Sequence, residues 1–139
     1  MFMEPLRLDG TDLSPEIILD PGQHHFSITG VSRPEDVRSF YYPVIEWCNK
    51  LETEFVDTGK IKFDKEHPLK LTIKLKYFNS SSAKFLYDIF IVFGKISRKD
   101  QQVEIDWYYD EGDDDMLDAG QEMSDIAEIP FSFIENKES

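Results

Sequence analysis

A run of three hydroxyl side chains has the most distinctive chemistry in this chain of 139 residues. Ser80, Ser81 and Ser82 directly follow Asn79, between a strand pattern and a strongly apolar helical pattern. An asparagine at such a junction caps a helix, and the free backbone N–H groups of the first helical turn favour an anion. Ordinary capping explains the run. Alternatively, a phosphoryl group on one hydroxyl would add about −1.5 to −2 charges at a rigid surface point.

Other side chains that often perform chemistry are poorly placed for it. None of the three histidines, His24, His25 and His67, has the i, i+4 helical partner of a zincin-type zinc site. Cys48 falls on an apolar helical stripe, where a buried thiol is unreactive, and as a single cysteine it forms no internal disulfide. The sequence also lacks a glycine-rich phosphate loop. It therefore predicts no metal site, no cofactor and no catalytic residues.

Acidic residues are concentrated in residues 110–128, which contain nine Asp or Glu and no Lys or Arg. A calcium loop starting at Glu111 would place three acids in ligand positions, but Met116 stands where such a loop needs glycine. Acids at a helix N-terminus and on its solvent face explain the same stretch through the helix dipole. A divalent-metal module using residues 110–118 and a docking surface for a basic partner are the alternatives.

The charge balance limits the class of partner. Fifteen Lys and Arg against 28 Asp and Glu give a formal charge of −13, so neither nucleic acid nor an anionic membrane is an expected partner. Residues 60–76 carry six lysines against two acids, a local surplus that suits a protein contact or solubility. No apolar run approaches the ~20 residues of a membrane span, and no signal peptide is recognisable, so we expect a cytoplasmic protein.

Alternation and helical spacing predict the order β-β-α-β-α-β-α-β for the elements around the serine run. Residues 20–22 form a turn signal between two short strands. Residues 32–35 match a capping box, so a first helix should begin there and carry its apolar stripe to Phe55, with a bend before Pro43. The other expected elements are strands over residues 71–77, 103–109 and 131–134 and helices over residues 79–98 and 113–128.

Apolar and polar residues alternate along two of these strands, which predicts a sheet covered on one face only. We expect a mixed sheet with all three helices on the same side. The open face should carry Lys74, Lys76, Glu104 and Asp106, and the third helix should bury Met116, Ala119, Gly120, Met123, Ile126 and Ala127. Residues 1–13 lack a period and predict a flexible N-terminal arm, followed by one domain over residues 14–135 and a tail over residues 136–139.

Three segments, RPEDVRSFYYPVIEW, YFNSSSAKFLYDI and WYYDEGDDDMLDAG, resemble the SiaC family of bacterial regulatory phosphoproteins. The resemblance extends over residues 14–135. It implies a single α/β domain similar to the STAS domain of anti-sigma-factor antagonists, with a mixed β-sheet and helices packed on one face. It also implies a non-enzymatic partner switch in signal transduction, and it makes the acidic segment part of the family pattern, which favours this interpretation over the divalent-metal module.

The resemblance further implies three partners. These are a serine/threonine kinase of the histidine-kinase-like ATPase type, a metal-dependent serine/threonine phosphatase, and a target such as a diguanylate cyclase in cyclic-di-GMP signalling. The unmodified form would bind and activate the target; a constitutive interaction module without a phosphoswitch is the alternative. The family's phosphoacceptor directly follows the asparagine and is therefore Ser80, with Ser81 as the second candidate. The expected partner-binding residues are Asn79, Ser80, Ser81, Ser82 and Lys84.

Overall fold

The computed structural model describes residues 3–137, which form one mixed α/β domain, as predicted. The element order is the predicted one with an additional strand at the N-terminal end. The strands are β1 (Leu6–Leu8), β2 (Glu16–Asp20), β3 (His25–Ser32), β4 (Leu69–Phe78), β5 (Val103–Asp110) and β6 (Phe131–Asn136). The α-helices are α1 (Val37–Lys50), α2 (Ser80–Ser97) and α3 (Asp114–Ala127).

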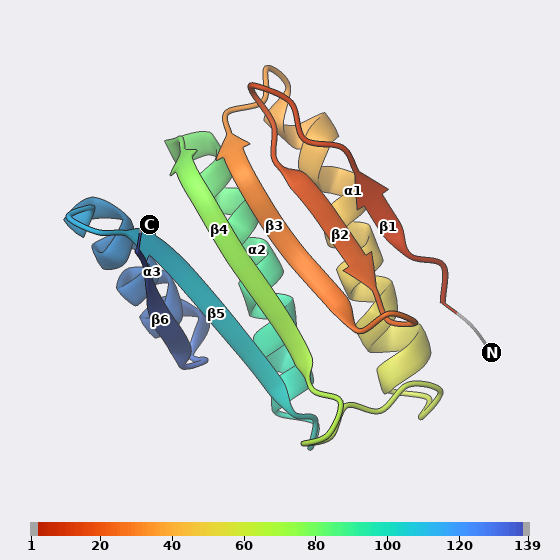
Figure 1. Ribbon diagram of the computed structural model, residues 1–139. Coiled ribbons are helices and arrows are strands. Elements are labelled where there is room, and N and C mark those ends of the chain that lie inside the picture. The colour runs from red at the N-terminus through yellow and green to blue at the C-terminus, as the bar shows by residue number, and fades with distance from the viewer. Residues whose placement is uncertain (1–2, 138–139) are drawn as a thin grey trace.

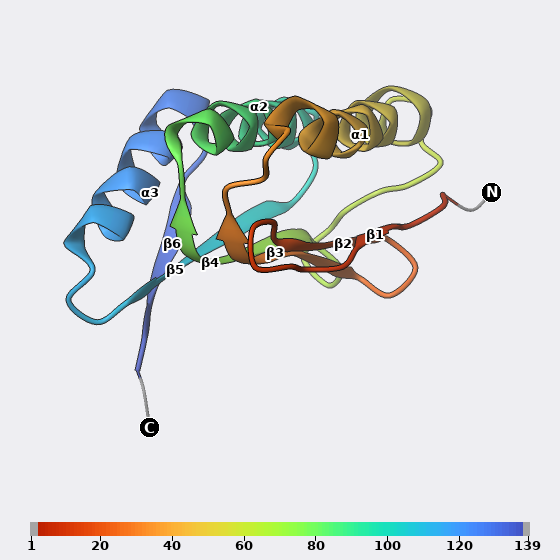
Figure 2. The same ribbon diagram turned by 90° about the horizontal axis from the view of Figure 1, so that it is seen from above.

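The strands lie side by side in chain order in a single sheet (Figure 1). β1, β2 and β3 pair antiparallel through short connections, whereas β3 to β6 pair parallel because a helix connects each strand to the next. The three helices cover one face of the sheet, which confirms the prediction (Figure 2). Lys74 and Lys76 are exposed, as predicted. Asp106 is instead buried, and its Oδ2 pairs with Lys70 Nζ at 3.3 Å.

The N-terminal segment belongs to the sheet, so the prediction of a flexible arm over residues 1–13 is wrong for its described part. β1 pairs antiparallel with β2, Arg7 binds Asp20 at 2.7 Å, and Met3 is buried in the core. A strand of three residues offers too little alternation to be recognised among charges, proline and glycine. At the other end, β6 extends into the predicted tail as far as Asn136. Residues 1, 2, 138 and 139 lie outside the described part.

The first helix begins later than the capping-box pattern predicts. Asp36 is the cap, because its Oδ1 accepts a hydrogen bond from the Ser39 backbone N–H at 3.2 Å. Ser32 instead ends β3, where its side chain is buried. After Lys50 the helix continues as a π-helical segment, η1 (Leu51–Val56), which keeps Phe55 in the core as its place on the apolar stripe predicts.

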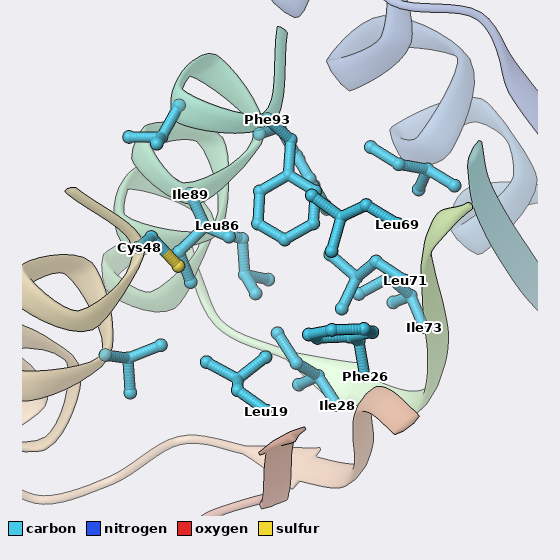
Figure 3. Close-up of a cluster of buried hydrophobic side chains, with 14 of the residues drawn as sticks. Leu19, Phe26, Ile28, Cys48, Leu69, Leu71, Ile73, Leu86, Ile89 and Phe93 are labelled. Carbon is cyan, nitrogen blue, oxygen red and sulfur yellow. The ribbon is translucent and has the colours of Figure 1, made fainter. Parts of the chain in front are cut away.

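The main core lies between the sheet and the helices α1 and α2 (Figure 3). Leu71 and Ile73 of β4 face Leu86 and Phe93 of α2 across this layer, and all four side chains are buried. Cys48 is fully buried beside them, and burial raises the pKa of its thiol to about 12. The thiol is therefore protonated and without access to reagents, as its place on the apolar stripe predicts.

Helix α3 packs against the sheet through a narrow face centred on Gly120 and Met123. The Trp107 indole of β5 donates a hydrogen bond from Nε1 to the Met116 carbonyl at 3.0 Å, and a Cβ atom at Gly120 would lie only 2.6 Å from that nitrogen. The prediction that Ile126 belongs to the buried face is wrong, because its side chain is 49% exposed. α3 sits at the side of α2, so only part of its apolar stripe reaches the sheet (Figure 2).

Candidate functional site

The serine turn, residues 79–82, connects the end of β4 to the start of α2. Asn79 caps the helix, its Oδ1 accepting a hydrogen bond from the Ser82 backbone N–H at 2.9 Å. Ser80 and Ser81 fill the first two helical positions, and both are exposed. Ser82 points inward and is fully buried. The turn therefore presents two accessible hydroxyls beside the positive end of the helix dipole.

A chain of buried hydroxyls fastens the serine turn to the neighbouring strand and helix. Ser82 donates to the Ser32 carbonyl at 3.0 Å, and Ser32 donates to the Ser82 hydroxyl at 2.8 Å. The Tyr41 hydroxyl lies 2.6 Å from the Ser32 hydroxyl, whose only proton already points to Ser82, so Tyr41 is the donor. The backbone N–H of Asn79 also donates to the Ser32 carbonyl, at 3.1 Å. Strand β3, helix α1 and the serine turn are thereby held together.

The burial of Ser82 corrects one predicted contact. Ser82 is not a partner-binding residue in this fold, because its side chain is inaccessible and its hydroxyl is occupied within the domain. Each helical residue is rotated by about 100° from the one before it, so three consecutive serines face three different directions. Among the other predicted members of the surface, Asn79 is partly exposed and three are exposed: Ser80, Ser81 and Lys84.

Helical periodicity also separates Ser80 from Ser81. Ser80 shares a row with Lys84 and Tyr87, at i+4 and i+7, and both of these side chains line a hollow together with residues of α3. Ser81 shares a row with Phe85, which stacks on Tyr41 of α1 with ring centroids 5.8 Å apart. Helical periodicity therefore places Ser80 on the row that meets α3 and Ser81 on the row that meets α1.

Two adjoining hollows lie on the α3 side of the serine turn, and we call them together the α2–α3 groove. They share Phe78 and Ala119, and the hollow between the helices has a volume of ≈ 350 Å³. The apolar lining of this second hollow comprises Phe78, Ala83, Tyr87, Ala119, Met123 and Ile126. Sequence reasoning missed the groove because it depends on how far α3 stands from α2.

The two walls of the α2–α3 groove carry opposite charges. In the hollow between the helices, Lys84 comes from α2 and Glu122 from α3, while in the adjoining hollow Lys76, at the end of β4, lies with Asp113 and Asp115 at the start of α3. Lys84 also pairs with Asp88 at 3.4 Å, but an exposed i, i+4 pair contributes little and leaves the ammonium available. The groove is thus an apolar trough with one basic and one acidic edge.

The other residues considered from the sequence form no catalytic or metal centre. His24 and His67 stack on each other with ring centroids 4.6 Å apart. Over residues 3–137, no three His, Cys, Asp or Glu side chains are grouped closely enough to hold a metal ion. Asp113 caps α3 by accepting a hydrogen bond from the Met116 N–H at 3.1 Å. Within the same part of the chain, no helix has the length and apolar composition needed to cross a membrane.

The burial of Tyr41 should make the stability of the protein sensitive to alkali. Burial raises the pKa of Tyr41 to about 12 from an ordinary value of 10.0. Because the Tyr41 pKa is higher in the folded state than in the unfolded state, the free energy of unfolding keeps its full value below about pH 10. It falls as the pH rises from about 10 toward about 12, where the unfolded state loses the phenol proton first. Tyr41→Phe should be less stable than wild type at about pH 8, but should lose less stability between about pH 8 and about pH 11. Urea unfolding of both proteins at several pH values tests this; parallel losses would contradict it.

Accessible hydroxyls at a helix N-terminus beside an apolar groove are features of a protein-interaction domain. The comparison with known families agrees. The model of the SiaC family, described as a family of regulatory phosphoproteins, matches residues 8–136, and this chain is a member of that family. It is accordingly a regulatory protein and not an enzyme.

Relatives with similar sequence and structure come from Pseudomonas aeruginosa. An uncharacterized protein of strain UCBPP-PA14 is 27% identical over 130 residues, covering 94% of this chain and 95% of the relative. SiaC of P. aeruginosa superimposes with a TM-score of 0.77 at 26% identity, covering 96% of this chain and 100% of that one. A third match is the crystal structure of the diguanylate cyclase SiaD in complex with its activator SiaC, with a TM-score of 0.77, 26% identity and coverage of 94% and 99%.

Proposed function

We propose that this protein is a cytoplasmic partner switch that binds and activates a diguanylate cyclase while Ser80 is unmodified. A serine/threonine kinase of the histidine-kinase-like ATPase type would phosphorylate Ser80, and a metal-dependent serine/threonine phosphatase would restore the active form. Support for the cyclase comes from the relative that activates SiaD in P. aeruginosa. Support for a phosphoryl switch comes from the family of regulatory phosphoproteins to which the chain belongs.

The single observation that carries the choice of Ser80 is the geometry of the serine turn. Ser80 is exposed at the first position of α2, while the turn is held from behind by Asn79 and Ser82. A kinase can therefore reach the hydroxyl without unfolding the domain, and the free N–H groups of the helix accommodate the added phosphate. Ser81 is also exposed but lies on the row of Phe85, which meets α1 and not the α2–α3 groove, so it is the second candidate.

The direct test is enzymatic activation. Each diguanylate cyclase encoded in the same genome is purified and assayed for cyclic-di-GMP formation with unmodified protein, with Ser80→Ala and with Ser81→Ala. We expect at least one cyclase to be stimulated by all three, because none of them carries a phosphate. Protein phosphorylated at Ser80 should stimulate that cyclase much less.

The outcomes of this assay separate the alternatives. Stimulation of no cyclase would refute the proposed target class. Equal stimulation by the phosphorylated and unmodified proteins would indicate a constitutive interaction module. Loss of stimulation only when Ser81 is phosphorylated would show that Ser81, on the row next to α1, is the regulatory residue instead of Ser80.

A further inference from the structure

We infer that the α2–α3 groove binds an amphipathic helix of the target, with flanks of opposite charge: acidic along α2 and basic along α3. The apolar stripe of this helix would fill the groove, and its flanks would match the charged edges. The inference rests on the proposed function, because the helix is assigned to the target whose binding Ser80 controls. It adds the place and the chemistry of that contact.

The groove brings together partly exposed apolar side chains from β4, α2 and α3. Tyr77 and Ile126 are about half exposed, at 51% and 49%, and each lines one of the two adjoining hollows. Between them, Phe78 and Ala119 line both hollows and make the apolar floor continuous. A trough between two helices that is lined by apolar side chains suits the apolar face of a third helix.

The charges at the two edges specify which helix would fit. Lys76 and Lys84 favour acidic residues along one flank of the occupant. Asp115 and Glu122, on the opposite edge, favour basic residues along the other flank. No Lys or Arg occurs in residues 110–128, so a basic flank meets no repulsion from α3. A helix with two acidic flanks would be repelled by α3, and one with two basic flanks would face Lys76 and Lys84.

The position of Ser80 explains how a phosphate there would release a helix bound in the groove. Ser80 lies one helical turn before Lys84 on the same row of α2. A phosphate on Ser80 would pair with the Lys84 ammonium, which removes positive charge from the basic edge, and would repel the acidic flank of the occupant. The acidic edge of the groove at Glu122 would be unaffected. The same modification on Ser81 would point toward α1 and act much less on the groove.

The test uses a synthetic helical peptide of about 18 residues. It has a leucine stripe, lysines along one flank and glutamates along the other. Titration followed by amide chemical shifts should map the peptide to the groove residues, including Ala83 and Ala119. Ile126→Glu should weaken binding about tenfold, because it places a charge in the apolar trough. Ile126 is half exposed, so this variant should fold.

Controls separate specific docking from general attraction to an acidic protein. Tyr42→Ser removes an aromatic side chain that is 58% exposed on α1, outside the groove, and should bind the peptide like wild type. A peptide with lysines on both flanks reports non-specific attraction. Absence of measurable binding, shifts that map elsewhere, or equal binding by wild type and Ile126→Glu would overturn the inference.

The inference and the proposed function fail in different ways. If the peptide binds in the groove but the protein stimulates no cyclase, the proposed function is refuted, while the groove is supported as a binding site for an amphipathic helix. If wild type and Ile126→Glu stimulate a cyclase equally, the groove is not the contact site for the target, while the cyclase remains the target.

Discussion

Phosphorylation of Ser80 should weaken the binding of the target about a hundredfold, a loss of about 2.8 kcal/mol in binding free energy. A phosphate adds about −1.5 to −2 charges, and like charges or unpaired desolvated charges at an interface cost several kcal/mol. The melting temperature should change little, because the free N–H groups at the start of α2 accommodate the phosphate. The effect should therefore appear in binding and not in stability.

Titration of the purified cyclase with each form of the protein measures this effect. Ser80→Ala should bind like wild type and resist the kinase, whereas Ser80→Asp should release the target only in part, because one carboxylate carries less charge than a phosphate. Mass-spectrometric mapping of protein from its native cell identifies the modified residue. A phosphate that maps away from residues 80 and 81, or equal affinity of modified and unmodified protein, would show that this switch is wrong.

Replacing Gly120 by alanine should destabilise the fold by about 2 kcal/mol or more. The new Cβ would lie 2.6 Å from Trp107 Nε1 and 2.7 Å from two carbons of the same indole ring. Trp107 is completely buried, so the ring has no space into which it can move. Its displacement would also strain the hydrogen bond to the Met116 carbonyl, which joins β5 to α3.

Helix propensity by itself predicts that Gly120→Ala is stabilising, so the sign of the change in unfolding free energy distinguishes the two effects. Alanine is better than glycine in a helix interior by about 1 kcal/mol. Gln121→Ala at the adjacent exposed position is the matched control and should stay within about 0.5 kcal/mol of wild type. Denaturant unfolding of the three proteins decides between the two effects. If Gly120→Ala proved as stable as Gln121→Ala, the close approach of α3 to Trp107 would be contradicted.

Several elements could be predicted from the sequence because short-range chemistry specifies them. Asn79 caps α2 and leaves Ser80 at its first position, as an asparagine before an apolar helical period requires. The alternation in β4 predicts a covered and an open face, and the structure has both. The stripe carrying Cys48 predicts its burial. These features depend on neighbours within one or two turns or along one strand.

Other features depend on residues far apart in the chain, and the local pattern misleads there. Ser32 matches a capping box but bonds to Ser82, 50 residues away, because β3 and β4 are parallel neighbours that end at the same edge of the sheet. The three residues of β1 are a strand only because β2 offers them a partner. A local pattern carries no information on which distant group competes for a hydrogen bond.

The candidate site shows the same division. The sequence by itself determined a capped helix that starts with serines, an apolar stripe and a run of acids on α3, since each follows from residue type and helical spacing. Only the tertiary structure decided that Ser82 is buried in the core, that Lys84 and Tyr87 on the row of Ser80 line a hollow beside α3, and that Ile126 is left exposed in the same hollow. The reason is geometric: the distance and angle between α2 and α3 are set by side chains of the whole core, including Trp107 against Gly120, and no single segment contains them.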